Sequence, residues 1–262
     1  MPWLSNATMR RLILALLLAL LMPLQAWAAL ATLGAVNNSG TVAGGTQIIQ
    51  SYTSTTTSNP SCLVVMLPTY SGAPSASAGA TVSTWSGHTF TRVTPASAST
   101  ADYTAEIFVA PLGSTHTAAT ANLQVDWVDT VYSMAIIQQI DNCHQTMANH
   151  HDGAKDEHGA GSGTASVTVA NLVTTDWLIG TFIKGDGSVA YTNASSYTSI
   201  TELVHPGLTT RRLLSAYITG LTGSNAISAT FDSTAWAGAA VGLAEAAGGA
   251  ATANFFMRRI QP

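Results

Sequence analysis

The sequence predicts an all-β protein, an antiparallel two-sheet sandwich of jelly-roll-like form with about 10–13 short strands. Helical patterns are nearly absent, because the Ala-rich stretches 96–105 and 237–251 are interrupted by Ser, Thr or Gly. Short runs rich in Val, Ile, Thr and aromatic residues recur instead, bounded by Gly, Pro, Asn and Ser. A chain of 262 residues, 47% of them hydrophobic, is long enough for one all-β domain.

The first 28 residues read as a cleaved signal peptide. Arg10 and Arg11 precede an apolar run at 12–24, and a small-x-small cleavage site ends at Ala28. An uncleaved anchor is the alternative, but this run is short for a hydrocarbon core of roughly 30 Å. Met9 is the better initiator because it places both arginines at the terminus. We therefore expect only transient membrane contact and a secreted, periplasmic or cell-surface location.

Three segments follow the signal peptide. Residues 29–46 are small, polar and Gly-rich, which fits either a flexible leader or a first edge strand. Residues 47–245 form the single sandwich domain, and 246–262 are an Ala/Gly linker and a docked or disordered tail. The strands expected are 47–53, 62–67, 80–85, 89–93, 105–110, 122–128, 132–140, 166–169, 177–182, 199–204, 213–218, 226–231 and 236–243.

Two of these strands carry clear local signals. Leu123, Val125 and Trp127 alternate with polar residues, so they share one face of a strand. Ser86 stands in a Trp-Ser-Gly-His turn that predicts a hairpin, so its neighbour His88 does not indicate a nucleophile. No internal repeat of fixed period is found, which leaves solenoids and propellers unsupported.

Eight short segments along the chain follow a recognisable order: 58–60, 82–87, 107–111, 123–125, 139–142, 166–169, 177–179 and 235–237. In this order they resemble a recurring β-sandwich domain of secreted bacterial and phage-associated proteins. The resemblance implies a jelly-roll-like sandwich, and by analogy surface binding, adhesion or assembly. It carries no catalytic motif.

Charge excludes one class of partner. Only 8% of residues are charged and the formal net charge is −4. Removal of Arg10 and Arg11 with the signal peptide leaves seven basic and thirteen acidic residues, a net charge of −6. No basic surface for nucleic acid is therefore expected.

Histidines are concentrated in one segment. Four of the seven, His144, His150, His151 and His158, lie close together with Asp152 among them. Imidazole and carboxylate ligands suit a divalent metal such as zinc or copper if this Gly-rich loop folds back. The spacing matches no ligand signature, so a solvated polar loop is the alternative.

The two cysteines, Cys62 and Cys143, are suited to a disulfide in an oxidising compartment. A bridge between them would close a loop of about eighty residues and stabilise the fold by roughly 4 kcal/mol through chain entropy. Paired sulfurs would be available neither as metal ligands nor as nucleophiles.

Catalytic signals are weak. The sequence lacks a G-x-S-x-G elbow, an H-E-x-x-H motif and a P-loop. Asp126 and Asp129 flank Trp127, and paired carboxylates beside an aromatic ring suit glycoside hydrolysis. Glu106 with Asp102 is a weaker pair, and surface or turn acids are the alternative for both.

Aromatic side chains that stack on sugars are a further hypothesis. Most aromatics follow strand patterns typical of a core, whereas Tyr191 and Tyr197 lie in a polar loop and are the best candidates for exposed stacking.

Two functions follow. The first is a secreted, non-enzymatic sandwich that binds a glycan or another cell-surface component, or that self-assembles into fibres by pairing residues 29–46 with a neighbour's sheet edge. The second is a secreted hydrolase or metal-dependent enzyme that uses the histidine loop or the Asp126/Asp129 pair and needs a pocket there.

Overall fold

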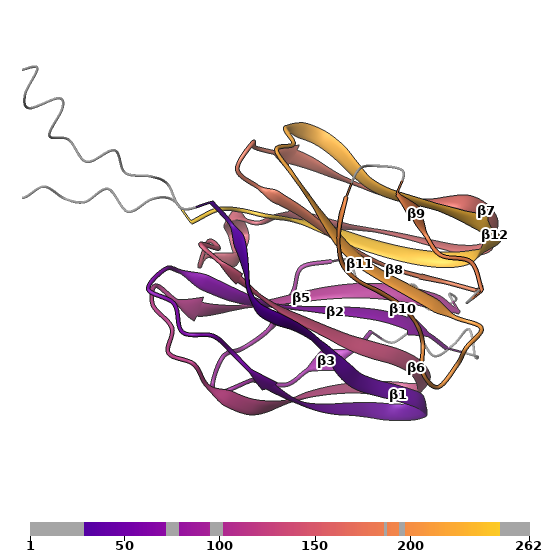
Figure 1. The fold of residues 1–262 in the computed structure, drawn as a ribbon, viewed down its shortest axis with the longest axis horizontal. Helices are drawn as coiled ribbons and strands as arrows, with labels where there is room; N and C mark the ends of the chain where they lie inside the picture. The colour runs from indigo at the N-terminus through magenta and orange to yellow at the C-terminus, as the bar shows by residue number, and fades with distance from the viewer. Residues whose placement is uncertain (1–28, 72–78, 95–101, 186–187, 194–196, 247–262) are drawn as a thin grey trace, which may run out of the picture.

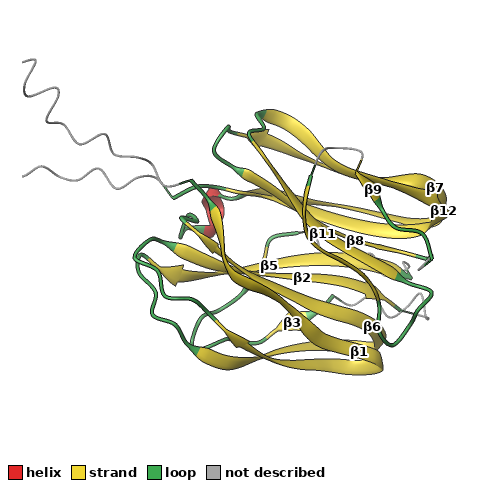
Figure 2. Cartoon of the chain, in the orientation of Figure 1, coloured by secondary structure: helices red, strands yellow, loops and turns green. Residues whose placement is uncertain are grey.

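Two antiparallel β-sheets packed face to face form the computed structural model of the chain (Figures 1 and 2). The structure describes residues 29–71, 79–94, 102–185, 188–193 and 197–246, with the backbone alone at 151–162, 193 and 232–234. The predicted all-β sandwich is therefore confirmed. The expected signal peptide and the tail from residue 247 lie outside the described residues.

The first half of the chain builds the first sheet. Its strands are β1 (Ala31–Thr53), β2 (Ser61–Tyr70), β3 (Thr81–Val82), β4 (Thr91–Arg92), β5 (Tyr103–Gly113) and β6 (Thr120–Asp141). They lie in the order β1-β6-β2-β5-β4, and β3 pairs with β6.

The second half builds the second sheet, after a short 3-10 helix, η1 (Met147–Asn149). Its strands are β7 (His151–Leu172), β8 (Trp177–Lys184), β9 (Thr192–Asn193), β10 (Thr198–Val204), β11 (Arg212–Thr219) and β12 (Gly223–Leu243). Read from β7, their order is β7-β12-β8-β11-β10, and β9 pairs with β12.

The two halves therefore repeat one topology, strand for strand. In the first half Cys62 pairs with Pro111 and Ile140, and in the second half Trp177 pairs with Thr219 and Leu243 in the equivalent positions. These partners follow their equivalents by 115, 108 and 103 residues, respectively. Because loops of different length separate the strands, the spacing is not constant and a search for a fixed period does not detect this repeat.

This arrangement differs in detail from the expected jelly-roll-like form. Each sheet contains consecutive strands, whereas strands of a jelly roll pass between its two sheets along the chain. Four strands, β1, β6, β7 and β12, are also long, at 21 to 23 residues. Within the described part of the chain, the segments expected as separate strands at 122–128 and 132–140 are both parts of β6, and 226–231 and 236–243 are both parts of β12.

Three hydrophobic clusters hold the sandwich together. Alternate residues of β2 belong to different clusters, with Val64 in the cluster between the sheets and Leu63 in the cluster on the outer face of the first sheet. The outer cluster also contains Leu123 from the far half of β6. The long β1/β6 ribbon therefore curls back over its own sheet, and β7/β12 does the same over the third cluster (Figure 1).

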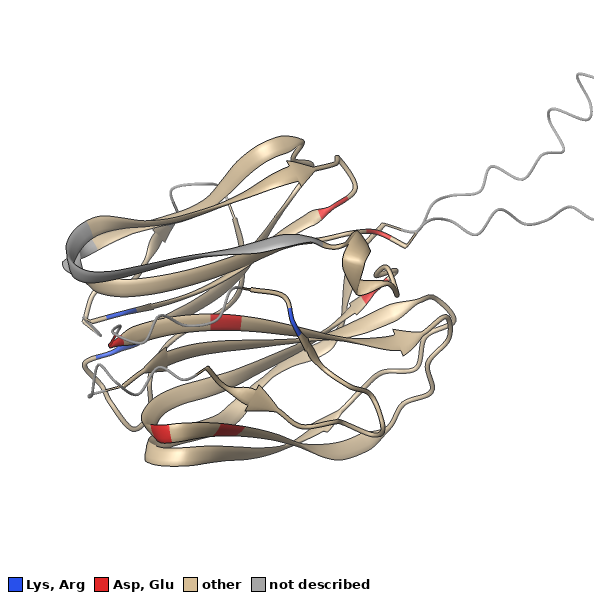
Figure 3. Ribbon diagram, turned by 180° about the vertical axis from the view of Figure 1, so that it is seen from behind, with Lys and Arg blue, Asp and Glu red and all other residues tan. Residues whose placement is uncertain are grey.

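The segment 29–46 is not a free leader. From Ala31 onward it belongs to β1, the edge strand, which pairs with β6 of the same chain. The two ends of the described chain lie side by side near η1 at one end of the sandwich (Figures 1 and 2). Lys, Arg, Asp and Glu are sparse among the described residues of both sheets (Figure 3). The described residues include no helix with the length and hydropathy of a membrane span.

Candidate functional site

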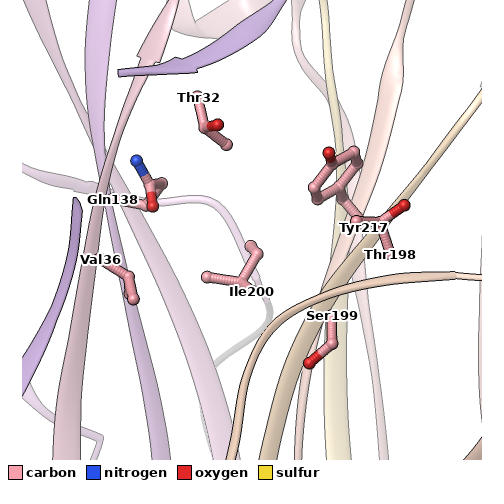
Figure 4. A pocket seen from close by; sticks show the side chains of 7 residues that line it. All are labelled: Thr32, Val36, Gln138, Thr198, Ser199, Ile200 and Tyr217. Carbon is pink, nitrogen blue, oxygen red and sulfur yellow. The ribbon is translucent and has the colours of Figure 1, made fainter. Parts of the chain in front are cut away.

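A groove opens between the two sheets, where β1 and β6 of one face β10 and β11 of the other (Figure 4). Its volume is about 300 Å³. The lining side chains are all uncharged: Thr32, Val36, Gln138, Thr198, Ser199, Ile200 and Tyr217. Hydroxyl and amide groups alternate there with apolar carbon, which suits a neutral ligand that carries both kinds of surface.

The aromatic wall of this groove is held rigidly. The ring of Tyr217 stacks on Trp177 with centroids 4.1 Å apart and planes 3° apart. Trp177 is buried in the cluster between the sheets, so it fixes the plane of the half-buried tyrosine. The neighbouring edge strands are tied together by Asn38, whose Nδ2 donates to Thr201 Oγ1 at 3.1 Å.

The amide wall is also fixed in place. Gln138 is 3% exposed, and its Nε2 donates to the carbonyl oxygens of Leu33 and Gln139, each at 3.0 Å. These bonds anchor the side chain between β1 and β6. The groove is therefore preformed on both sides.

A second candidate lies at the end of the sandwich near the two ends of the described chain. Cys62 and Cys143 form a disulfide with a Cα–Cα distance of 5.8 Å, and both residues are fully buried. The predicted pairing is confirmed. His150, 6% exposed, places a ring nitrogen within 4.8 Å of both sulfur atoms.

The connecting segment 142–150, between β6 and β7, brings His150 close to the two cysteines. Ala244, just after β12, accepts a hydrogen bond from the His144 N–H at 2.9 Å and donates its own N–H to His150 Nδ1 at 3.1 Å. Cys143 forms a β-bridge with Glu245. These contacts hold the connecting segment 142–150, which carries Cys143 of the disulfide, against the residues that follow β12.

The expected convergence of four histidines is wrong. His151 begins β7 and pairs with Gly242, whereas His158 pairs with Trp236. The seven residue-to-residue steps from His151 to His158 span about 23 Å of extended strand. The segment from His151 is a strand and not a loop, so the backbone holds His151 and His158 too far apart to share one ion. The side chains of both histidines and of Asp152 lie outside the described ones.

The remaining histidines separate as well. His144 accepts a hydrogen bond from the Thr146 N–H at Nδ1, 3.0 Å away, and contacts Asn149. His150 instead faces the cysteines. The sequence grouped His150 with its neighbours along the chain, but the sulfur atoms near its ring belong to Cys62 in β2 and to Cys143, which follows the end of β6.

Of the two predicted carboxylates, Asp126 is held by amide side chains. Asp126 accepts hydrogen bonds from Gln47 Nε2 at 2.6 Å and from Gln124 Nε2. Neither Asp126 nor Asp129 lines the inter-sheet groove. Asp126 is bound instead by one amide from the adjacent strand β1 and one from its own strand β6.

Glu106 has a structural environment. It is 1% exposed, forms an ion pair with Arg92 Nε at 3.1 Å, and accepts a hydrogen bond from the Ala80 N–H at 2.7 Å. These contacts pin the 79–94 segment to β5. A buried carboxylate with these partners anchors the fold.

The expectation of exposed stacking at Tyr191 is wrong. Its side chain is 6% exposed and packs between Phe182 and Phe231. Burial, followed by the charge of Glu202, raises the pKa of Tyr191 well above the usual value of 10.0. Tyr197 is only partly buried against the same cluster, and burial raises its pKa too.

The Trp85–His88 hairpin is present, closed by reciprocal backbone hydrogen bonds, with Ser86 and Gly87 at positive φ in the turn. Ser86 is therefore a turn residue, as predicted. Ser54 Oγ contacts His116 Nε2 at 2.6 Å nearby, but these residues are 3% and 8% exposed, so a substrate has no access to the pair.

The groove residues escaped sequence-based reasoning. Gln138 and Tyr217 lie on separate sheets and belong to ordinary strand patterns, so no local signal marks them. Comparisons of the chain with protein families, with curated proteins and with solved structures find no match. The resemblance to secreted bacterial β-sandwich domains accordingly stays a prediction.

Proposed function

We propose that this chain is a secreted, non-enzymatic surface-binding protein that holds a neutral glycan in the groove between its sheets. The observation that carries the proposal is the uncharged lining with Tyr217 fixed on Trp177. The disulfide and the lack of a membrane-spanning helix in the described chain are compatible with an extracellular or periplasmic location.

The chemistry of a sugar matches this lining. One face of a pyranose ring is apolar and packs on an aromatic ring, while its rim of hydroxyls needs hydrogen-bonding partners. Tyr217 supplies the ring, and Thr32 with Ser199 supplies hydroxyls on opposite walls. Because both walls are preformed, little conformational entropy is lost when the ligand binds.

Titration calorimetry with neutral oligosaccharides of glucose, xylose and N-acetylglucosamine tests this function. Tyr217→Ala should weaken binding about fivefold, because an aromatic contact contributes about 1 kcal/mol. Ser199→Trp fills the groove from an exposed position and should abolish binding while leaving the Tyr217–Trp177 stack intact.

The matched control is Val128→Ala, at a residue 75% exposed and outside the groove lining, which should bind like the original protein. Binding should also be independent of salt, since no lining residue is charged. If no oligosaccharide binds, or if Ser199→Trp binds as tightly as the original protein, the proposal is wrong.

A further inference from the structure

We propose that Cys62, Cys143 and His150 form a metal site for a thiolate-binding ion when the protein is reduced, and that the disulfide is its oxidised, closed state. The three ligand atoms lie within 4.8 Å of one another. Each residue is more than nine-tenths buried, at 0%, 0% and 6% exposure. This site is separate from the inter-sheet groove and does not rest on the function proposed for it.

The donor set selects the ion. Two thiolates and one imidazole are the ligands preferred by Zn(II) and Cu(I), whereas hard ions such as Ca²⁺ and Mg²⁺ prefer oxygen. Two sulfurs bound at about 2.3 Å to one tetrahedral ion lie about 3.8 Å apart. Cleavage of the S–S bond allows that separation, and an imidazole within 4.8 Å needs only a small movement to join them.

The metal site opens when a thiol–disulfide exchange reduces the Cys62–Cys143 bond. A dithiol reductant supplies two electrons and two protons, so that the disulfide becomes two protein thiols and the reductant becomes its own cyclic disulfide. Metal binding then displaces the two thiol protons to solvent. While the S–S bond is intact, neither sulfur is a thiolate and the site is closed.

Gln145 supports the sulfurs. Its Nε2 donates to the Cys143 carbonyl at 2.8 Å and contacts Cys62 Sγ at 3.9 Å, while its Oε1 accepts from the Gly113 N–H at 2.7 Å. An amide N–H directed at a sulfur stabilises a thiolate there. Gln145 is thus a positioning residue for the site.

Charge and coordination distinguish the two ions. Zn(II) with two thiolates is neutral, which favours it in a buried site, but three protein ligands leave its fourth position for water. Cu(I) is satisfied by three ligands and leaves a net charge of −1. The shared chemistry is thiolate binding, and separate titrations with each ion identify the one preferred.

Binding has a second consequence at the end of β12. In the disulfide form His150 Nδ1 accepts the Ala244 N–H at 3.1 Å. An ion on Nδ1 displaces that donor, and an ion on Nε2 moves the ring proton to Nδ1, where it opposes the same N–H. Metal binding therefore breaks the hydrogen bond from the Ala244 N–H to His150, whichever ring nitrogen binds the ion. The connecting segment 142–150 is then held less firmly at Ala244.

The test uses the full chain, purified as the disulfide form and as the anaerobically reduced form. Co(II), as a spectroscopic substitute for Zn(II), and Cu(I), in competition with a chromophoric chelator, are titrated into each form. We expect one ion per reduced chain, with sulfur-to-metal charge-transfer absorption for Co(II), and none in the disulfide form. Amide exchange at Ala244 should accelerate on loading.

Matched variants locate the ligands. His150→Ala should weaken binding by more than about a hundredfold, the upper limit for loss of an outer-shell partner. His144→Ala, at a neighbouring histidine, should change nothing, and the double variant Cys62→Ser/Cys143→Ser should bind no ion in either redox state.

Three results overturn the proposal. They are equal binding by both redox forms, equal effects of His150→Ala and His144→Ala, and no binding by the reduced chain, whether circular dichroism shows it folded or unfolded.

Discussion

Loss of the disulfide is the perturbation with the most calculable effect on stability. Cys62 and Cys143 are 81 residues apart, and closure of a loop of that length restricts the unfolded chain. The chain-entropy relation gives a stabilisation of about 4.5 kcal/mol at 25 °C. We expect Cys62→Ala/Cys143→Ala to lower the free energy of unfolding by about this amount and the melting temperature by about 10–20 °C.

The assay is urea denaturation followed by tryptophan fluorescence, with and without reductant. The original protein in reductant should match the double variant, and reductant should leave the variant unchanged. A loss smaller than about 1 kcal/mol would refute the reasoning, because it would mean that the long loop is already restricted in the unfolded chain. The groove should be unaffected, and oligosaccharide binding by the folded variant checks this.

Three further predictions concern buried polar groups. Trp85→Ala should lower the free energy of unfolding, measured by urea denaturation, by about 3–5 kcal/mol, because the ring is fully buried and its N–H donates to the Tyr52 and Ala121 carbonyls. Glu106→Ala should lower the free energy of unfolding by about 2–3 kcal/mol in the same assay. This is near the lower limit for a broken buried ion pair, because Arg92 keeps some contact with solvent. An unchanged urea midpoint would contradict the role of Glu106 as an anchor. Burial, followed by the charge of His88, lowers the pKa of His116 below 6.5. The unfolded state therefore binds the proton more readily, so this contribution to stability is complete above pH 6.5 and is lost as the pH falls through the lowered pKa. The pH dependence of the urea midpoint in that window should flatten in His116→Gln.

Local patterns predicted the strands well where one property of the chain was sufficient. Alternation placed Leu123, Val125 and Trp127 on one face, and all three are buried in the same cluster. The continuous apolar run of β2 has another cause, because nine of its ten residues are buried between two covering layers.

Local sequence patterns gave wrong predictions where contacts between segments far apart in the chain determine strand boundaries or side-chain exposure. Irregularities in the β1–β6 register allow one ribbon to bend without breaking, so two expected strands are one. Tyr191 carried a loop-like sequence, yet Phe182 and Phe231 from other strands cover it. Exposure depends on such neighbours and not on the residues adjacent in the chain.

The sequence by itself determined the all-β class and many of the strand-forming segments, because each follows from side-chain type or local spacing, and its count of two cysteines defined which pair a disulfide would join. Only the tertiary structure decided that the two halves repeat one topology, that His150 leaves the histidine-rich segment to face the disulfide, and that Gln138 and Tyr217 line one groove. Those relationships join residues far apart along the chain, and they depend on which strands pair and how the sheets stack. Alternation of polar and apolar residues indicates which way a side chain points, but it carries no information about which distant side chain it meets.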